Sequence, residues 1–182
     1  MSFHPTTQRL ILRAPTMTDM ASFVALLGDY DVAKNLRSVP NPYSKTLFRE
    51  FLVRSDHERR DGTDFTFAVT RAMDGAFLGV CALHKREAGA WSVGYWYGKP
   101  YWGQGYATEA AGPVLRFAFE DRGAARLTAD WFDDNPASGQ VLHKLGFSIT
   151  GVIRVRCLAR GTEVLSNSVE LTGAQFARKK AA

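Results

Sequence analysis

The sequence predicts one α+β or mixed α/β domain built around a mostly antiparallel sheet. Its 182 residues suit a single domain with a sizeable core. Three strand-like segments with short turns between them, typical of an antiparallel meander, lie at Phe65–Arg71, Ala76–His84 and Trp91–Tyr97. A helix separates the third segment from a strand at Arg126–Trp131, and this crossover should produce the one parallel pair.

The first third of the chain predicts one strand and two helices ahead of the meander. Residues 8–14 alternate in polarity and indicate a strand, and residues 16–29 carry apolar side chains at helical spacing. Residues 35–44 hold two prolines and predict a loop. A second helix, polar on one side, is expected over residues 45–60 and should end at the Asp-Gly pair that follows.

The rest of the chain predicts two helices and three strands. The expected order is a helix reaching about Asp121, the Arg126–Trp131 strand, a short helix at about Pro136–Leu145, and strands at Phe147–Leu158 and Glu163–Leu171. Pro113 predicts a kink in the first of these helices. We expect one domain over residues 1–182, with a core of about 7–171 and a tail over 172–182.

The charge balance is mildly basic. Lys and Arg number 23 against 18 Asp and Glu, and the surplus of five favours anionic ligands such as a phosphorylated cofactor. A basic nucleic-acid-binding module would need clustered Lys and Arg with stacking aromatics, whereas these residues look dispersed along the sequence. The short basic run at 178–180 is interpreted as a solvated tail.

The cellular location of the protein is predicted from two kinds of segment that we do not find, a membrane-spanning run and a secretory signal. We see no apolar run long enough to span a membrane and no secretory signal at the N-terminus. Cys81 and Cys157 both lie in apolar runs, which favours buried free thiols in a reducing compartment. The sequence therefore predicts a cytoplasmic protein with no membrane partner.

The segment "YWGQGYATEA", residues 101–110, places a glycine-rich turn between a strand and a helix. The N–H groups of a first helical turn are unsatisfied and attract anions, and glycine lets the backbone approach a phosphate closely. The dinucleotide fingerprint fails here because Thr108 stands where its third glycine belongs, and a Walker lysine is absent. A plain turn with no ligand remains the alternative for this stretch alone.

A second motif, "NPASGQVLHKLGF" at residues 135–147, accompanies the first. Together they resemble the GNAT superfamily of acetyl-coenzyme A-dependent N-acetyltransferases. Residues 102–107 are similar to that family's pyrophosphate loop, and residues 135–147 to its Asn-x-x-Ala/Ser…Lys-x-Gly-Phe segment. Further matches ("QRLILRAPTMTDM", "GYWYGKPYWGQGYATEA", "GFSITGVIR") are similar to the ribosomal-protein alanine N-acetyltransferase (RimJ/RimL-like) branch. The resemblance covers roughly residues 7–171.

The resemblance implies an acyl-CoA N-acyltransferase fold, with helices on both sheet faces and a parallel strand pair that splays at its C-terminal ends. Acetyl-CoA would bind as co-substrate in that gap and transfer acetyl directly to an amine. The backbone of Tyr95, Trp96 and Tyr97 would hold its pantetheine arm. The residues expected around the pyrophosphate are Trp102, Gly103, Gln104, Gly105, Tyr106, Ala107 and Thr108.

Three further roles follow from the resemblance. The backbone N–H near Tyr97 would polarise the thioester carbonyl, and Ser138 would hydrogen-bond the departing thiolate. Asn135 would contact the pantetheine, although it could also simply cap the next helix. Trp131 is the candidate for the acceptor pocket. Ser138 could instead be a small residue that suits packing.

The usual proton-transfer groups of the family are missing. Leu142 stands where many members have a tyrosine, and Ser92 where this branch often has a glutamate. Trp102 replaces the superfamily's usual Gln or Arg, and Lys99-Pro100 replaces the branch's Pro-Glu. Without an obvious base, the chain is better matched to an α-amine, a fraction of which is already neutral at pH 7.

Other ionisable residues have simpler interpretations. Water relayed by Asp130 or Asp133 could still serve as a base. Glu109 is expected to favour the helix dipole rather than to act as a base, and His143 to be exposed. The remaining histidines look isolated, and no metal-ligand spacing is present, so no metal is expected.

The sequence thus predicts an acetyl-CoA-dependent N-acetyltransferase acting on a protein N-terminus or a small amine. The alternative is a CoA-binding sensor or interaction domain that has lost turnover, which only the missing tyrosine and glutamate favour. Dimers are common among proteins of this type, so a homodimer is one option for its assembly.

Overall fold

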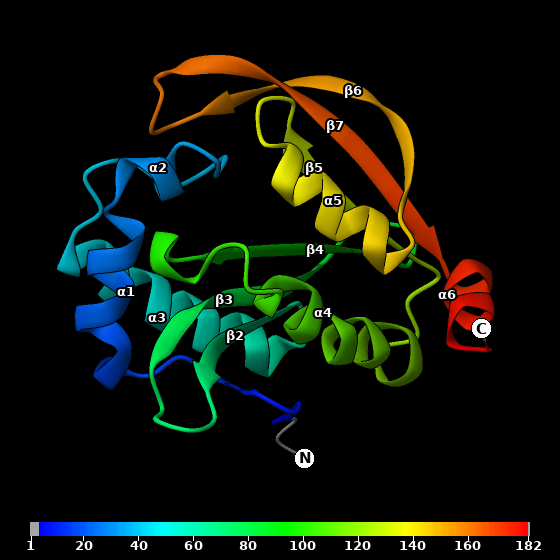
Figure 1. Ribbon diagram of the computed structural model, residues 1–182, viewed down its shortest axis with the longest axis horizontal. Helices are drawn as coiled ribbons and strands as arrows, with labels where there is room; N and C mark the ends of the chain where they lie inside the picture. Colours follow the sequence, from blue (N-terminus) through cyan, green and yellow to red (C-terminus); the bar gives the residue numbers. More distant parts are fainter. Residues whose placement is uncertain (1–3, 182) are drawn as a thin grey trace.

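The computed structural model describes residues 4–181, which form one domain around a seven-stranded sheet (Figure 1). The spatial order of the strands is β1-β2-β3-β4-β5-β7-β6. The strands are β1 (Leu10–Arg13), β2 (Asp64–Arg71), β3 (Phe77–Lys85), β4 (Ala90–Tyr97), β5 (Arg126–Phe132), β6 (Ser148–Cys157) and β7 (Thr162–Thr172). The predicted α+β class and the meander β2–β3–β4 are confirmed.

Helical segments cover both faces of the sheet (Figure 1). They are η1 (Met17–Asp19), α1 (Met20–Leu27), α2 (Tyr30–Ala33), α3 (Lys45–Asp61), η2 (Lys99–Tyr101), α4 (Tyr106–Arg116), η3 (Phe117–Asp121), α5 (Pro136–Leu145) and α6 (Gly173–Ala181). The Ser44 side chain accepts from the Leu47 N–H at the start of α3, and Gly62 ends that helix in the left-handed conformation.

Alternating side chains of the strands build a core on each face of the sheet. One face packs against α4 and α5 and contains, among others, Phe67, Cys81, Leu83, Val93 and Leu127. The opposite face packs against α1 and α3 through Phe23, Phe48, Ala68, Val80 and Ala82. Both cysteines are buried free thiols, as predicted. The two faces matter for function because a ligand in the sheet can be approached from either side.

Three local features differ from the sequence prediction. The short helix α2 was not predicted, and the expected tail forms α6 instead. The Lys180 ammonium lies 2.8 Å from a Glu120 carboxylate oxygen, so the basic run is partly tied down. The helix α4 continues through Pro113 and changes to π-helical geometry only at Phe117, where η3 begins.

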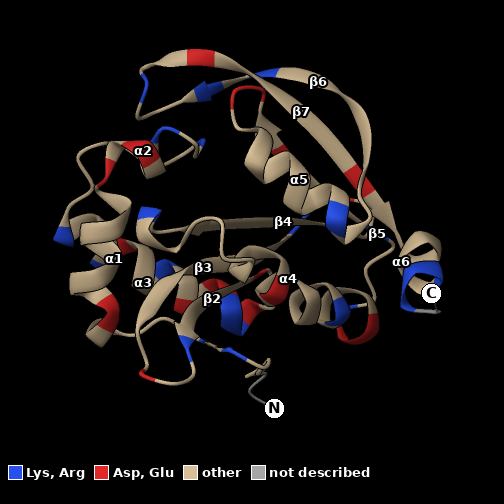
Figure 2. Cartoon of the chain, viewed as in Figure 1, with Lys and Arg blue, Asp and Glu red and all other residues tan. Residues whose placement is uncertain are grey.

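The β6–β7 hairpin extends beyond β5 and arches over the chain near α2 (Figure 1). The Arg160 side chain at its turn donates to the Lys34 carbonyl, and the Leu158 N–H donates to the Arg37 carbonyl. Lys and Arg are spread over helices, strands and loops of the molecule (Figure 2). Among residues 4–181, no helix has the length and apolar character needed to cross a membrane.

Candidate active site

The two parallel strands β4 and β5 separate after three paired residues. Their register pairs Ala90–Ser92 with Arg126–Thr128, and it ends there. β4 nevertheless continues to Tyr97 and β5 to Phe132. The strands therefore leave a gap at their C-terminal ends, as the predicted splay requires, and we call this opening the β4–β5 gap.

The free edge of β4 presents backbone groups to the gap. The Gly98 N–H donates to the Leu78 carbonyl of β3. Because successive residues of an antiparallel ladder point their polar groups to opposite sides, the N–H groups of Tyr95 and Tyr97 point away from β3, toward the gap. The Tyr97 carbonyl already accepts from Trp102 Nε1 at 2.7 Å. The Trp96 side chain lies on the α1 face, where its ring contacts Phe23.

The glycine-rich turn leads from β4 into an uncapped helix. Gly103 and Gly105 have φ angles of 74° and 81°, which a side chain would strain. No side chain caps α4, and the N–H groups of Tyr106, Ala107 and Thr108 have no acceptor within residues 4–181. Three parallel donors at the positive end of a helix form an anion site. The turn therefore fits a diphosphate.

Arg9, just before β1, braces this turn from the neighbouring edge of the sheet. Its guanidinium donates to the Gln104 carbonyl at 3.1 Å and lies 4.6 Å from the centre of the Tyr106 ring. It also donates to Glu109, which accepts from Thr7 Oγ1 at 2.6 Å and from the Arg9 N–H at 3.0 Å. The position of the turn thus depends on a residue almost one hundred positions earlier in the sequence.

The contacts of Glu109 argue against its use as a base. Partial burial alone would raise the pKa of its carboxyl group, but the hydrogen bonds from Thr7 and Arg9 outweigh burial and lower it. A carboxylate that accepts three or more hydrogen bonds and has a lowered pKa is a weak proton acceptor. Glu109 therefore has a structural role, holding the N-terminal segment against α4.

Ser138 and Asn135 lie at the start of α5, opposite the edge of β4. Asn135 is the N-cap residue, and its side chain accepts from the Ser138 N–H at 3.4 Å. The Ser138 hydroxyl lies 3.0 Å from the Tyr95 hydroxyl, which also donates to the Ser138 carbonyl at 3.0 Å. The structure thus brings together two residues that the sequence analysis treated separately, and it joins them side chain to side chain.

The hydroxyl groups of Tyr95 and Tyr97 both stay protonated at neutral pH. Burial raises the pKa of Tyr95 well above its usual range, although the hydrogen bond with Ser138 opposes this. Burial, assisted by the neighbouring Cys81, also raises the pKa of Tyr97, whose hydroxyl has no partner in the described part of the chain. Tyr95 is therefore the better-placed hydroxyl for hydrogen bonding at the gap.

The remaining predicted residues lie around α5 and β5. Trp131 packs beneath α5, so closely that a Cβ on Gly139 would come within 2.7 Å of its ring. That position is on the α4–α5 face, and an acceptor role for Trp131 stays a prediction. His143 is exposed, as expected, and Leu142 is buried.

The two aspartates considered as water relays are already engaged. Asp130 accepts from Arg37 at 2.9 Å and from Ser166 at 2.8 Å, and Asp133 accepts from the Asn167 amide at 3.0 Å. Their oxygens hold β5 against its neighbours. Within residues 4–181, no group of three or more His, Cys, Asp or Glu is arranged to hold a metal ion.

His84 is not isolated, contrary to the sequence analysis. Its Nδ1 contacts a carboxylate oxygen of Asp64, the residue directly opposite it on β2. Twenty positions separate the two in the sequence, and only the β2–β3 register brings them together. Once a meander is predicted, pairing its strands could have revealed this contact.

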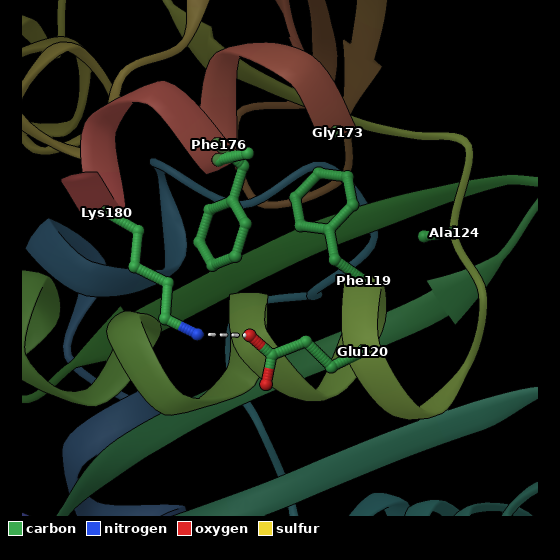
Figure 3. Close-up of a pocket in the computed structure, with 7 residues that line it drawn as sticks. Phe119, Glu120, Ala124, Gly173, Phe176 and Lys180 are labelled. Atoms are coloured by element: carbon green, nitrogen blue, oxygen red, sulfur yellow. Dashed lines mark hydrogen bonds and ion pairs between the residues drawn. The ribbon is translucent and has the colours of Figure 1, made fainter.

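A separate hollow of about 510 Å³ lies between α6 and η3 (Figure 3). Phe119 and Phe176 stack along it with ring centres 4.7 Å apart, and the Lys180–Glu120 ion pair lies at one end. None of the predicted site residues lines it. It is a shallow feature of helix packing, away from the β4–β5 gap.

Comparison with known proteins agrees with this geometry. The family model described as "Acetyltransferase (GNAT) domain" matches residues 9–148, more than half of the chain. The chain belongs to the GNAT acetyltransferase family. It is therefore an acetyl-CoA-dependent acyltransferase, and members of this family transfer acetyl groups to amines.

Individual GNAT relatives are moderately or distantly similar. The chain is 30% identical over 172 residues to "Uncharacterized N-acetyltransferase YoaA" of Bacillus subtilis, covering 88% of this chain and 92% of that protein. The structure of Mycobacterium smegmatis RimJ in complex with CoA-disulfide has a TM-score of 0.80 at 20% identity, covering 94% and 88% of the two chains. Spermidine N-acetyltransferase from Vibrio cholerae, solved with CoA and spermine, gives 0.79 at 16% identity, covering 94% and 99%.

Proposed function

We propose that this GNAT protein transfers acetyl from acetyl-CoA to a primary α-amine, either of a protein N-terminus or of a small amine. The observation that carries the proposal is the β4–β5 gap, which leads directly to the uncapped N-terminus of α4. A long ligand with a diphosphate at one end and a thioester at the other matches that layout. Similar proteins solved with CoA support it.

One set of residues binds the cofactor, and another set assists the acetyl transfer. The N–H groups at residues 106–108 hold the diphosphate, and the β4 edge binds the pantetheine arm. Bound acetyl-CoA supplies the activated acetyl group as a thioester. The N–H of Tyr97 stabilises negative charge on the thioester oxygen. Ser138 donates a hydrogen bond, and then its proton, to the departing sulfur, and the Tyr95 hydroxyl lies 3.0 Å from the Ser138 hydroxyl.

An α-amine is favoured because much less proton removal is needed. From reference values, roughly 10% of an α-amine is neutral at pH 7, against about 0.04% of a lysine ε-amine. The difference, about 250-fold, lies inside the range that a general base supplies. Position 92, where the branch often has a strand glutamate, is Ser, so a carboxylate base is missing there and the less basic amine is the better match.

The test is thiol release from acetyl-CoA with a panel of amines. The panel should contain short peptides with free N-termini, the same peptides with blocked N-termini and a free lysine side chain, amino acids and spermidine. Faster release with free N-termini than with ε-amines at pH 7 supports the proposal. Binding of acetyl-CoA without release for any amine would instead favour a binding domain, and a preference for ε-amines would contradict the α-amine assignment.

A further inference from the structure

A polar pair, Asp64 and His84, lies on the sheet face opposite α4 and α5. Asp64 is buried, and one of its carboxylate oxygens, Oδ1, accepts from Thr66 Oγ1 at 2.9 Å. The other oxygen, Oδ2, contacts His84 Nδ1. A carboxylate only accepts hydrogen bonds, so Nδ1 is the donor in this contact, and in the tautomer that has its proton on Nδ1 the Nε2 atom is an acceptor.

The Nε2 atom of His84 lies beside Gly94, in the part of β4 that no longer pairs with β5. In the register of the sheet, His84 is opposite Ser92, and Ser92 is the last residue of β4 that pairs with β5. The Nε2 atom lies 3.8 Å from the point that a Cβ on Gly94 would occupy. Gly94 has no side chain to fill this space, and the next residue, Tyr95, points its N–H into the gap.

We propose that His84 is the general base for the acceptor amine and that Asp64 positions it. This rests on the proposed function and supplies the base that the missing glutamate at Ser92 leaves open. The face is the appropriate one, because Ser138 and Tyr95 are on the α4–α5 side and an amine attacking from the opposite side meets His84. Imidazole is also nearer in reference basicity to an α-amine than to an ε-amine, which agrees with the proposed substrate class.

In the transfer step, a C–N bond forms and the C–S bond of the thioester breaks. The amine nitrogen gives its electron pair to the carbonyl carbon, forming the C–N bond, and passes one proton to His84 Nε2. The C–S bond breaks with its electron pair on sulfur, which takes the proton of Ser138, and solvent returns a proton to the Ser138 oxygen. The Asp64 carboxylate stabilises the imidazolium until solvent removes its proton. The products are the N-acetyl amine and CoA thiol.

Other charged groups around His84 bear on its pH dependence. Arg54 and Glu58 of α3, Asp64 of β2, and Lys85 and Arg86 after His84 surround a hollow of about 340 Å³ beside the ring. Arg59 acts electrostatically on Asp64. Because these groups could shift a pH profile by themselves, the test combines the profile with a change of acceptor.

The experiment compares His84→Gln with the wild type, with an alanine-starting peptide and with hydroxylamine as acceptors. We expect kcat/KM at pH 7 to fall about 100-fold or more for the peptide, with a much smaller fall for hydroxylamine, which is neutral at that pH. Acetyl-CoA affinity measured by calorimetry should change less than threefold. Adding Ser92→Glu to His84→Gln should recover part of the peptide rate. His57→Gln, an exposed histidine on α3, is the matched control.

Asp64→Asn tests the same assignment with the His84 ring retained. It should lower the peptide rate and alter the pH profile, while leaving acetyl-CoA affinity unchanged. A peptide rate within about threefold of wild type in folded His84→Gln overturns the proposal, as does an equal loss with both acceptors. If the wild type acetylates no amine at all, the proposed function fails instead, so the two failures are distinguishable.

Discussion

The hydroxyl groups of Tyr95 and Ser138 lie 3.0 Å apart and connect the free edge of β4 to the start of α5. The contact spans 43 positions in the sequence and forms because α5 packs over the end of β5 beside the gap. It gives the protein a hydrogen-bonded pair near the place where the family's usual tyrosine, here Leu142, is absent.

Removing either hydroxyl should slow turnover without weakening cofactor binding. We expect Ser138→Ala to lower kcat about 100-fold and Tyr95→Phe to lower it less, because Tyr95 acts through Ser138. The double variant should resemble Ser138→Ala, since residues that act as a unit are not additive. Steady-state kinetics and acetyl-CoA titration provide the measurements, with Tyr30→Phe as control. Wild-type rates in Ser138→Ala would reduce Ser138 to a packing residue.

Gly105→Val should abolish tight acetyl-CoA binding. The β-branched side chain would crowd the Arg9 guanidinium, which lies 3.6 Å from the position of its Cβ, and the φ of 81° would strain it by about 1–2 kcal/mol. Gly62→Val imposes similar strain at φ 70°, with no atom within 4 Å, at the remote end of α3. Calorimetric titration of both variants separates the effects. Unchanged affinity in Gly105→Val would refute the diphosphate site.

Glu109→Gln should loosen the turn that Arg9 braces. We expect a loss of about 1 kcal/mol of stability at pH 7, below the full value of a charged hydrogen bond because Arg9 is partly exposed, together with weaker acetyl-CoA binding. The pKa of Glu109 is lowered by folding, so its contribution is present above the unfolded pKa and is lost as pH falls through the folded pKa. The wild-type advantage in urea unfolding should therefore shrink below about pH 4. A constant advantage down to pH 2 would contradict it.

Asp19→Asn should destabilise the fold far more than Asp74→Asn. Asp19 is buried and accepts from Nη1 and Nη2 of Arg13, at 2.8 and 2.6 Å, and from the Thr16 N–H. Leaving Arg13 without its charge partner should cost about 3 kcal/mol. Asp74 forms a similar two-point contact with Arg71 on the surface, where solvent screens it. Comparable urea midpoints for the two variants would contradict the importance of burial.

By itself, the sequence determined the order of the elements, the meander and the position of the glycine-rich turn. These depend on short-range signals: alternation along strands, helical spacing, caps such as Ser44, and glycines where φ is positive. The sequence did not reveal α2, and it left the α6 segment as a tail. The C-terminal α6 packs Phe176 on Phe119.

Only the tertiary structure decided which side chains meet. Strand register placed Asp64 against His84, helix packing placed Ser138 against Tyr95, and the edge of the sheet brought Arg9 to Glu109. Each of these contacts joins residues 20 to 100 positions apart, and local spacing carries no information about such distances. The physical reason is that hydrophobic burial fixes how the elements pack, and the polar pairs of the site form where that packing leaves their side chains facing each other.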